Sequence, residues 1–502
     1  MIQRIKTQSK SDRMTTSGKL GVFGLAAIVV SSMIGGGIFS LPQNMAQSAS
    51  AGAVILAWLI TGFGMYFIAN TFRILSNARP DLTTGVYLYA RAGFGNYMGF
   101  NIGWSYWLCQ IFGNVGYAVI TMDALNYFFP GVFAGGNNLY SIIGGSILIW
   151  FFNFLVLRGV KQAALINLVV TIAKIVPLAL FIIIVAAVFN IDKFDFDFWG
   201  RANELKLGDI PNQVKNTMLV TLWAFIGIEG AVVLSGRAQS QSDVGRATLI
   251  GFLGCLAIYV LLSVLPFGVM SQQQLAGIPN PSTAGVLQTI VGSWGAWLMN
   301  VGLIIAILAS WLSWTMIVAE MPYAMAYNGA FPKVFRRENT SGSPNISLII
   351  TSLLMQLAMI LVYFAGNAWN TMLSITGVMV LPAYFMSCLY LWKLCEDHQF
   401  PNNIGISRFS ALMTGIIGTV YASWLIYAAG LSYLLMAVVF IAIGIPVYLW
   451  ARHEQGAGIL PDKTRHNQPV RYFDDAERAL CVAIIVIALV AIYAFARGLI
   501  QL

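Results

Sequence analysis

The chain has 502 residues, of which 58% are hydrophobic and only 9% are charged, and its formal net charge is +9. About a quarter of the residues in ordinary soluble domains are charged, so the composition excludes a water-soluble protein of this length. The apolar runs are long and unbroken, which excludes the alternating pattern of a membrane β-barrel. The sequence therefore predicts an all-α integral membrane protein.

Thirteen apolar stretches are long enough to cross a bilayer as helices. In chain order they are residues 20–42, 52–76, 93–127, 138–157, 163–189, 212–236, 246–270, 284–327, 346–365, 369–394, 408–429, 431–451 and 479–499. The first ten stretches, within residues 20–394, are predicted to form a ten-helix core. Residues 395–451 would add two helices, and residues 479–502 would add a last one.

Lys and Arg residues are distributed unevenly between the predicted loops. With the N-terminus in the cytoplasm, the tail of residues 1–19, the loop of residues 452–478 and the other inner loops hold most of the 28 Lys and Arg residues. Because an excess of Lys and Arg marks cytoplasmic loops, we expect a cytoplasmic N-terminus in a plasma membrane, which in a bacterium is the inner membrane. This placement also explains the net charge without a nucleic acid partner.

Two of the apolar stretches are interrupted by glycines near their middle. The first contains three consecutive glycines at residues 35–37, and the sixth contains Ile-Gly-Ile at residues 226–228. Glycines allow close helix packing, but each destabilises a helix by roughly 1 kcal/mol relative to alanine, which favours a functional break. Interrupted helices in both halves of a chain are typical of the binding site of a secondary transporter.

The sequence lacks the residues that membrane enzymes and pumps need. It contains no GxxxxGK(S/T) phosphate-binding loop, no HExxH and no GxSxG. Its five cysteines show no metal-ligand spacing. We therefore expect neither enzymatic activity nor ATP-driven pumping, and no cofactor or metal.

Three motifs, in order along the chain, resemble a known family. They are residues 31–42 (Ser-Ser-Met-Ile-Gly-Gly-Gly-Ile-Phe-Ser-Leu-Pro), residues 223–229 (Trp-Ala-Phe-Ile-Gly-Ile-Glu), and Trp314 with residues 328–332 (Asn-Gly-Ala-Phe-Pro). They are similar to the first, sixth and eighth helices of the amino acid–polyamine–organocation (APC) superfamily. The resemblance implies a LeuT-like five-plus-five inverted repeat with broken helices 1 and 6, followed by additional C-terminal helices.

Within that superfamily the chain looks most like the basic amino acid/polyamine antiporters, particularly the arginine/ornithine antiporters. Residues 229–230, 235–237 and 244–248 carry this narrower resemblance. It implies sodium-independent exchange of a cationic amino acid, of the arginine or lysine class, for its metabolic product, ornithine or an amine. Proton-coupled amino acid uptake is the alternative within transport, and a receptor or channel-like protein is the alternative outside it. The implied partners are amino acid or amine substrates and the lipid bilayer, and the sequence leaves a homodimer open.

The expected binding site combines backbone groups with aromatic and polar side chains. N–H groups freed at the first break would bind a substrate carboxylate, and carbonyl groups at the second break would bind its amino group. The resemblance implies that Trp314 stacks on the cationic end of the substrate, that Trp223 closes over it and that Asn114 binds its side chain. The expected substrate contacts are Met33, Gly35, Gly36, Gly37, Gln110, Asn114, Tyr117, Trp223, Ile226, Gly227, Trp314, Ser374 and Thr376.

The tenth helix departs from the family pattern. The register set by Pro382 places Ile375 where the family has a substrate-contacting serine, with Ser374 and Thr376 on either side. Ala383 stands where the family has a gate tyrosine. Side-chain selectivity is therefore the least determined part of the expected site.

An acidic residue, Glu229, directly follows the second break. A buried carboxylate is costly unless it is paired or neutralised, so an acid at membrane depth is expected to be functional. The resemblance implies that Glu229 belongs to a gate that contacts tyrosines, with Tyr106 of the third helix as a partner. The alternative is a protonated glutamate that only bonds a neighbouring helix.

Lys174 is the one Lys or Arg that the sequence places deep within a predicted span. A long side chain can reach the interface from a helix end, but apolar residues flank Lys174 on both sides. Some superfamily members carry a fifth-helix lysine where sodium-coupled relatives bind Na⁺, which implies that this ammonium replaces the ion and couples transport. Glu320 on the eighth helix is its candidate partner, with a position at the cytoplasmic mouth as the alternative.

Overall fold

A computed structural model describes residues 21–82, 86–158, 163–200, 208–229, 241–401, 404–457 and 471–500. Every regular element within these ranges is a helix. Ten of the described helices are long and apolar enough to cross a membrane, and a bent pair near the N-terminus brings the number of candidate spans to 11. The prediction of an all-helical membrane protein is confirmed.

Two of the predicted spans are not among these candidates. α8 (Ala163–Ala187) occupies the fifth predicted span, and α10 (Ile210–Ala224) occupies the first half of the sixth. The last part of the sixth span, residues 230–236, the motif at residues 235–237 and the basic tail of residues 1–19 lie outside the described residues. Thirteen spans therefore stay a prediction.

The first predicted span is broken at its glycines. α2 (Val22–Met33) is followed by Ile34, whose ψ of 81° is not helical, and by Gly35, which is extended. The 3-10 helix η1 (Gly36–Ser40) then leads into α3 (Leu41–Ala46), with Pro42 in the first turn, where its missing N–H is tolerated. The two halves of the span are bent by 52° relative to each other.

The sixth predicted span is also broken. α10 ends at Ala224, and the chain continues in tight turns, in which the N–H of Ile226 donates to Trp223 O at 3.1 Å and that of Ile228 donates to Phe225 O at 3.1 Å. Gly227 has a φ of +105°, which side-chain-bearing residues rarely adopt. The helix therefore ends in the middle of the predicted span, and Gly227 lies in the non-helical segment that follows.

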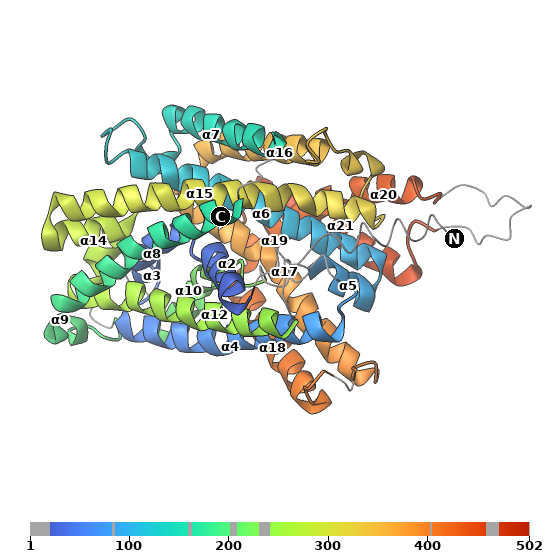
Figure 1. Ribbon diagram of the computed structural model, residues 1–502, viewed down its shortest axis with the longest axis horizontal. Coiled ribbons are helices and arrows are strands. Elements are labelled where there is room, and N and C mark those ends of the chain that lie inside the picture. The colour runs from blue at the N-terminus through green and yellow to red at the C-terminus, as the bar shows by residue number, and fades with distance from the viewer. Residues whose placement is uncertain are drawn as a thin grey trace, which may run out of the picture.

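Long helices surround the two breaks. They are α4 (Ala51–Ala78), α6 (Asn96–Leu125), α7 (Leu139–Leu157), α12 (Gln241–Val264), α15 (Ser293–Tyr327), α16 (Asn345–Leu361) and α17 (Ala368–Glu396). α6 packs against α15 and α17, while α12 packs against α2 and α4. In Figure 1, α2 and α3 lie in the middle of the molecule, with α4 and α12 along one side and α7 and α16 along the other.

Shorter and peripheral helices complete the bundle. They are α5 (Val86–Phe94), η2 (Ala134–Gly136), α9 (Ile191–Asp195), η4 (Leu265–Gly268), α13 (Gln272–Gly277), α14 (Ser282–Val291), η5 (Lys333–Arg336), η6 (Val362–Phe364), α18 (Arg408–Ala428), α19 (Leu431–Ile443), α20 (Ile445–His453) and α21 (Asp475–Ala496). Large apolar side chains such as Ile147 and Leu489 are exposed on the outer helices, as expected of surfaces that face lipid.

Two predicted spans are wrong in their bounds. The predicted third span, residues 93–127, joins the end of α5 to α6, and the predicted eighth span, residues 284–327, joins α14 to α15. Gly95 and Gly292 separate these pairs with φ values of +98° and +79°. The apolar sequence continues through both glycines, so hydropathy does not reveal the corners.

Candidate functional site

The two helix breaks contact each other through Ser32. Its Oγ lies 2.8 Å from Val29 O in its own helix and 2.9 Å from Gly227 O in the sixth span. A Cβ at Gly227 would lie 2.9 Å from the backbone of Ser32, too close for any side chain. The carbonyl of Gly227, an expected contact for the substrate amino group, therefore lies within hydrogen-bond distance of the Ser32 hydroxyl.

A small cavity lies beside the two breaks. It is lined by Ser32, Met33, Gly35, Cys109, Gln110, Gly113, Asn114, Tyr117, Trp223, Ile226, Trp314 and Thr376. Its volume is about 40 Å³, room for a few water molecules, whereas pockets for small-molecule ligands measure roughly 300–1,000 Å³. The lining side chains therefore have to move apart before an amino acid can enter.

The cavity combines aromatic surface with polar atoms that lack partners. Asn114 Oδ1, Thr376 Oγ1 and both side-chain amide atoms of Gln110, Oε1 and Nε2, are buried and meet no hydrogen-bond partner in the part of the chain that the structure describes. Asn114 Nδ2 donates to Gln110 O at 2.8 Å, so the amide oxygen of Asn114 is left to accept. None of the described lining residues is charged. Such a site suits a ligand that brings N–H donors and the positive charge that an aromatic face attracts.

Most of the expected substrate contacts line this cavity, and four do not. A Cβ at Gly36 would lie 2.2 Å from Ile307 Cγ1, and a Cβ at Gly37 would lie 1.8 Å from Trp223 Cη2. The Cα atoms of Gly36 and Gly37 therefore pack closely against neighbouring side chains, which is the alternative interpretation of these glycines. Gly227 packs on Ser32, and Ser374 is absent from the lining, where Thr376 is present.

Three lining residues were not among the expected contacts: Ser32, Cys109 and Gly113. Cys109 and Gly113 precede Gln110 and Asn114 by one position each, so they lie on the adjacent edge of the same helical face. Ser32 belongs to the first-helix motif itself. The helical spacing of Asn114 and Tyr117 was the signal that could have extended the predicted face to them.

Glu229 accepts hydrogen bonds from both sides of its carboxylate. Its Oε1 accepts from the Tyr106 hydroxyl, and its Oε2 accepts from the Tyr384 hydroxyl at 2.9 Å and from Gly227 N–H at 3.2 Å. The side chain is 2% exposed, so these donors replace the water that a carboxylate would otherwise bind. One carboxylate thus connects α6, α17 and the second break.

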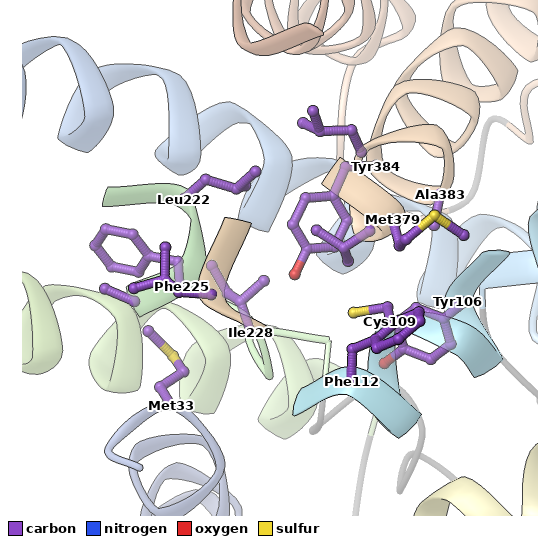
Figure 2. Close-up of a cluster of buried hydrophobic side chains, with 14 of the residues drawn as sticks. Met33, Tyr106, Cys109, Phe112, Leu222, Phe225, Ile228, Met379, Ala383 and Tyr384 are labelled. Carbon is purple, nitrogen blue, oxygen red and sulfur yellow. The ribbon is translucent and has the colours of Figure 1, made fainter. Parts of the chain in front are cut away.

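Ala383 stands where the family has a gate tyrosine, but a tyrosine hydroxyl still reaches Glu229 from α17. Tyr384, one position further along α17, supplies the hydroxyl. Neighbouring residues on a helix differ in direction by about 100°, but the length of a tyrosine side chain allows it to reach the same carboxylate. Figure 2 shows Tyr106 on α6 and Tyr384 on α17 approaching each other beside Cys109.

Lys174 is buried between three helices. Its Nζ donates to Ser31 O at 3.1 Å and lies 3.3 Å from Ser31 Oγ and 2.5 Å from Ser310 Oγ. The residue is 1% exposed, which excludes a side chain that extends to the interface. The ammonium therefore connects α8 to α2, just before the first break, and to α15.

The expected pairing of Lys174 with Glu320 is wrong. Lys174 contacts α15 at Ser310, and Glu320 lies ten residues further along the same helix, about 15 Å away at 1.5 Å per residue. Glu320 is exposed, whereas Ser310 is buried. The hydroxyl and carbonyl oxygens of two serines, rather than a carboxylate, surround the ammonium.

Comparison with known proteins places this architecture in a family. The sequence profile described as amino acid permease matches residues 20–452. The chain is 60% identical over 495 residues to an arginine/agmatine antiporter of Chlamydia pneumoniae, covering 98% of this chain and 100% of the relative. Arginine/agmatine antiporters of Chlamydia abortus and Chlamydia trachomatis serovar L2 are 63% and 56% identical, over 86% and 96% of this chain and 90% and 98% of their own lengths. The chain is a membrane transporter, and it belongs to the amino acid permease family.

Proposed function

We propose that the chain exchanges arginine for agmatine across a plasma membrane and does so without sodium. The single observation that carries this is the identity of 60% to a relative named arginine/agmatine antiporter, at 100% coverage of that relative. Agmatine is the amine left when arginine loses its carboxylate. The sequence left the counter-substrate open between ornithine and an amine. The relatives are arginine/agmatine antiporters, so they favour the amine over the ornithine that the narrower resemblance suggested.

The guanidinium group, which both substrates share, would provide most of their common affinity. Trp314 offers an aromatic face in a buried pocket, and a desolvated cation–π contact contributes about 2 kcal/mol or more. Asn114 Oδ1 and Thr376 Oγ1, which lack partners among the described residues, would accept from the guanidinium N–H groups. Neutral acceptors suit a site that must release its cation on the opposite side of the membrane.

The ends of the two substrates differ, and the first break would distinguish them. Gly36 and Gly37 open η1, so their N–H groups have no acceptor within that helix. They would bind the carboxylate of arginine, which agmatine lacks. The carbonyl of Ile226, in the wall of the cavity, would accept from the amino group that both substrates carry.

For the whole chain we infer the LeuT-like five-plus-five inverted repeat with thirteen spans and a cytoplasmic N-terminus. The two breaks lie in the first and sixth predicted spans, as an inverted repeat of five helices requires. Several arginines lie at helix ends near α5, η5 and α20: Arg79, Arg91, Arg336 and Arg452. In Figure 1, helices α5 and α20 lie at the same end of the bundle. This end would face the cytoplasm.

Competition by citrulline tests the substrate assignment. Citrulline has the shape of arginine but carries a neutral urea in place of the guanidinium. We expect unlabelled arginine and agmatine to compete with labelled arginine for uptake into proteoliposomes, and citrulline to compete at least tenfold more weakly. Equal competition by citrulline would contradict recognition by charge.

The volume of the cavity predicts a difference between two glycine-to-alanine variants. A Cβ at Gly113 would lie 3.5 Å from Thr376 Cγ2, an ordinary contact, whereas a Cβ at Gly35 would lie 2.6 Å from the Tyr117 hydroxyl. Gly113→Ala should therefore fold normally and raise the KM for both substrates several-fold. Gly35→Ala should lower activity further because Tyr117 has to shift. An unchanged KM in Gly113→Ala would show that this face of α6 does not contact the substrates.

The hydrogen bonds of Glu229 predict a gating defect. Glu229→Gln replaces one acceptor oxygen with a donor, opposite groups that already donate, so the links to α6 and α17 weaken. We expect exchange to slow by at least tenfold with little change in arginine binding, because gates act on conformational steps. Tyr384→Phe should reproduce part of the loss. Turnover equal to that of the wild type in both variants would leave Glu229 a structural residue.

A further inference from the structure

Trp223 is held over the cavity by a second tryptophan that does not line it. The rings of Trp223 and Trp369 pack edge to face, with centroids 5.4 Å apart and planes at 84°. A Cβ at Gly37 would lie 1.8 Å from Trp223 Cη2 and 2.7 Å from Trp369 Cη2, so both indoles rest on the backbone after the first break. Trp369 and this backbone therefore restrict the movement of the Trp223 ring on the side that they cover.

A chain of side-chain amides fixes Trp369 to that segment. Trp369 Nε1 donates to Asn44 Oδ1 at 3.3 Å, and Asn44 Nδ2 donates to Asn370 Oδ1 at 2.8 Å. Asn370 Nδ2 in turn donates to Gln47 Oε1 at 3.0 Å, and Gln47 Nε2 lies 3.4 Å from Ala276 O. We call Asn44, Gln47 and Asn370 the amide clasp. It connects α17 to α3, the second half of the first broken span, and to α13.

The geometry of the clasp specifies one arrangement of its amides. Each amide uses its oxygen as acceptor and its nitrogen as donor, so the chain of bonds has a direction from Trp369 to Ala276. Asn44 is 4% exposed and Trp369 is 3% exposed, so the bond between them is shielded from water, whereas Asn370 and Gln47 are partly buried. Individual neutral hydrogen bonds of this kind contribute little net free energy, which allows them to break and re-form during a transport cycle.

The closed cavity gives the clasp a function. At about 40 Å³ the cavity has to open before a substrate enters, and Trp223 is the lining residue that the clasp restrains. We propose that Asn44, Asn370 and Trp369 are positioning residues that hold Trp223 over the substrate and set the balance between closed and open states on the α3 side. The proposal rests on the proposed exchange for its substrate, but its main test does not depend on transport.

Cys109 provides a native reporter of that opening. It lines the cavity and is 1% exposed. We would apply the membrane-impermeant reagent 2-(trimethylammonium)ethyl methanethiosulfonate to the α3 side of proteoliposomes and follow the modification of Cys109 by peptide mass spectrometry. Asn44→Ala and Asn370→Ala should each be modified about tenfold faster than the wild type, a shift of 1.4 kcal/mol toward the open state. Excess arginine should slow the modification in every variant.

Asn367→Ala is the matched control. Asn367 Oδ1 accepts from Asn370 N at 3.0 Å as the N-cap of α17, so its loss weakens the same segment without touching α3. This variant should label at the wild-type rate. Asn44→Asp keeps the oxygen that accepts from Trp369 and loses the donor to Asn370, so it should label at the faster rate, and it replaces Asn44→Ala if the alanine variant does not fold.

Exchange kinetics separate positioning from simple destabilisation. In the clasp variants the apparent KM for arginine should fall on the α3 side and rise on the opposite side, because the population shifts toward one state. Wild-type labelling rates in the folded Asn44 and Asn370 variants, or faster labelling of Asn367→Ala, would overturn the clasp. A wild type that labels as described but does not exchange arginine would instead overturn the proposed function.

Discussion

Trp314→Leu should lower kcat/KM for arginine and for agmatine by similar factors of about thirtyfold, the loss that corresponds to a desolvated cation–π contact of about 2 kcal/mol. The residue lines the cavity and is 9% exposed, so its aromatic face is shielded from water. Both substrates present the same guanidinium to it, which is why the two losses should match. The measurement is initial-rate exchange in proteoliposomes with each labelled substrate.

Two variants control for shape and folding. Trp314→Phe keeps an aromatic face and should retain most of the activity that leucine loses. Trp311, three positions earlier on α15, is 0% exposed and packs on Phe152 with ring centroids 5.2 Å apart, away from the cavity lining. Trp311→Leu should lower thermal stability while arginine remains preferred over citrulline. Equal losses for leucine and phenylalanine at Trp314 would argue against stacking.

Lys174→Ala should reduce exchange by at least tenfold while the protein stays folded and the remaining activity stays indifferent to replacement of Na⁺ by choline. The ammonium forms hydrogen bonds that link α8 to α2 and α15. Its removal leaves the oxygens of Ser31 and Ser310 without a donor, so α8 keeps its packing against α2 and α15 but loses this polar link to them. Lys174→Arg should not restore activity, because a planar guanidinium does not fit the place of a compact point charge.

The comparison for Lys174 is a lysine outside the core. Lys193 lies in α9 and is exposed, with its Nζ 3.2 Å from Val269 O, so Lys193→Ala should leave exchange unchanged. Strict dependence of the wild type on Na⁺ would contradict the assignment of Lys174 to the place of an ion. A fully active Lys174→Ala variant would show that Lys174 only contributes to packing.

The sequence predicted the two helix breaks and most of the cavity lining because their signals are local. Consecutive glycines at membrane depth have few structural uses, and the side chains of Gln110, Asn114 and Tyr117 share a face through helical spacing alone. Which neighbours the Cα atom of each glycine faces after a break depends on the rotation of the new helix about its axis. Gly36 and Gly37 therefore contact Ile307 and Trp223 in a way that only the tertiary structure determines.

The remaining differences come from partners that are distant in the sequence. Tyr384 contacts Glu229 across 155 positions, and Lys174 contacts Ser310 across 136. Serines are common in membrane helices, and nothing in the neighbouring sequence indicates that one of them binds an ammonium group. The carboxylate of Glu320 was therefore predicted as the partner of Lys174. The amide clasp spans 326 positions between Asn44 and Asn370, and no spacing in the sequence relates its two ends.

Efflux of labelled arginine that external substrate stimulates tests the central claim most directly. Purified protein in proteoliposomes loaded with labelled arginine should release the label when agmatine or arginine is present outside, retain it when the outside holds buffer or citrulline, and behave alike in Na⁺ and in choline. Release of the label into substrate-free buffer at the same rate would contradict obligatory exchange, and release that agmatine does not stimulate would contradict the proposed substrate pair.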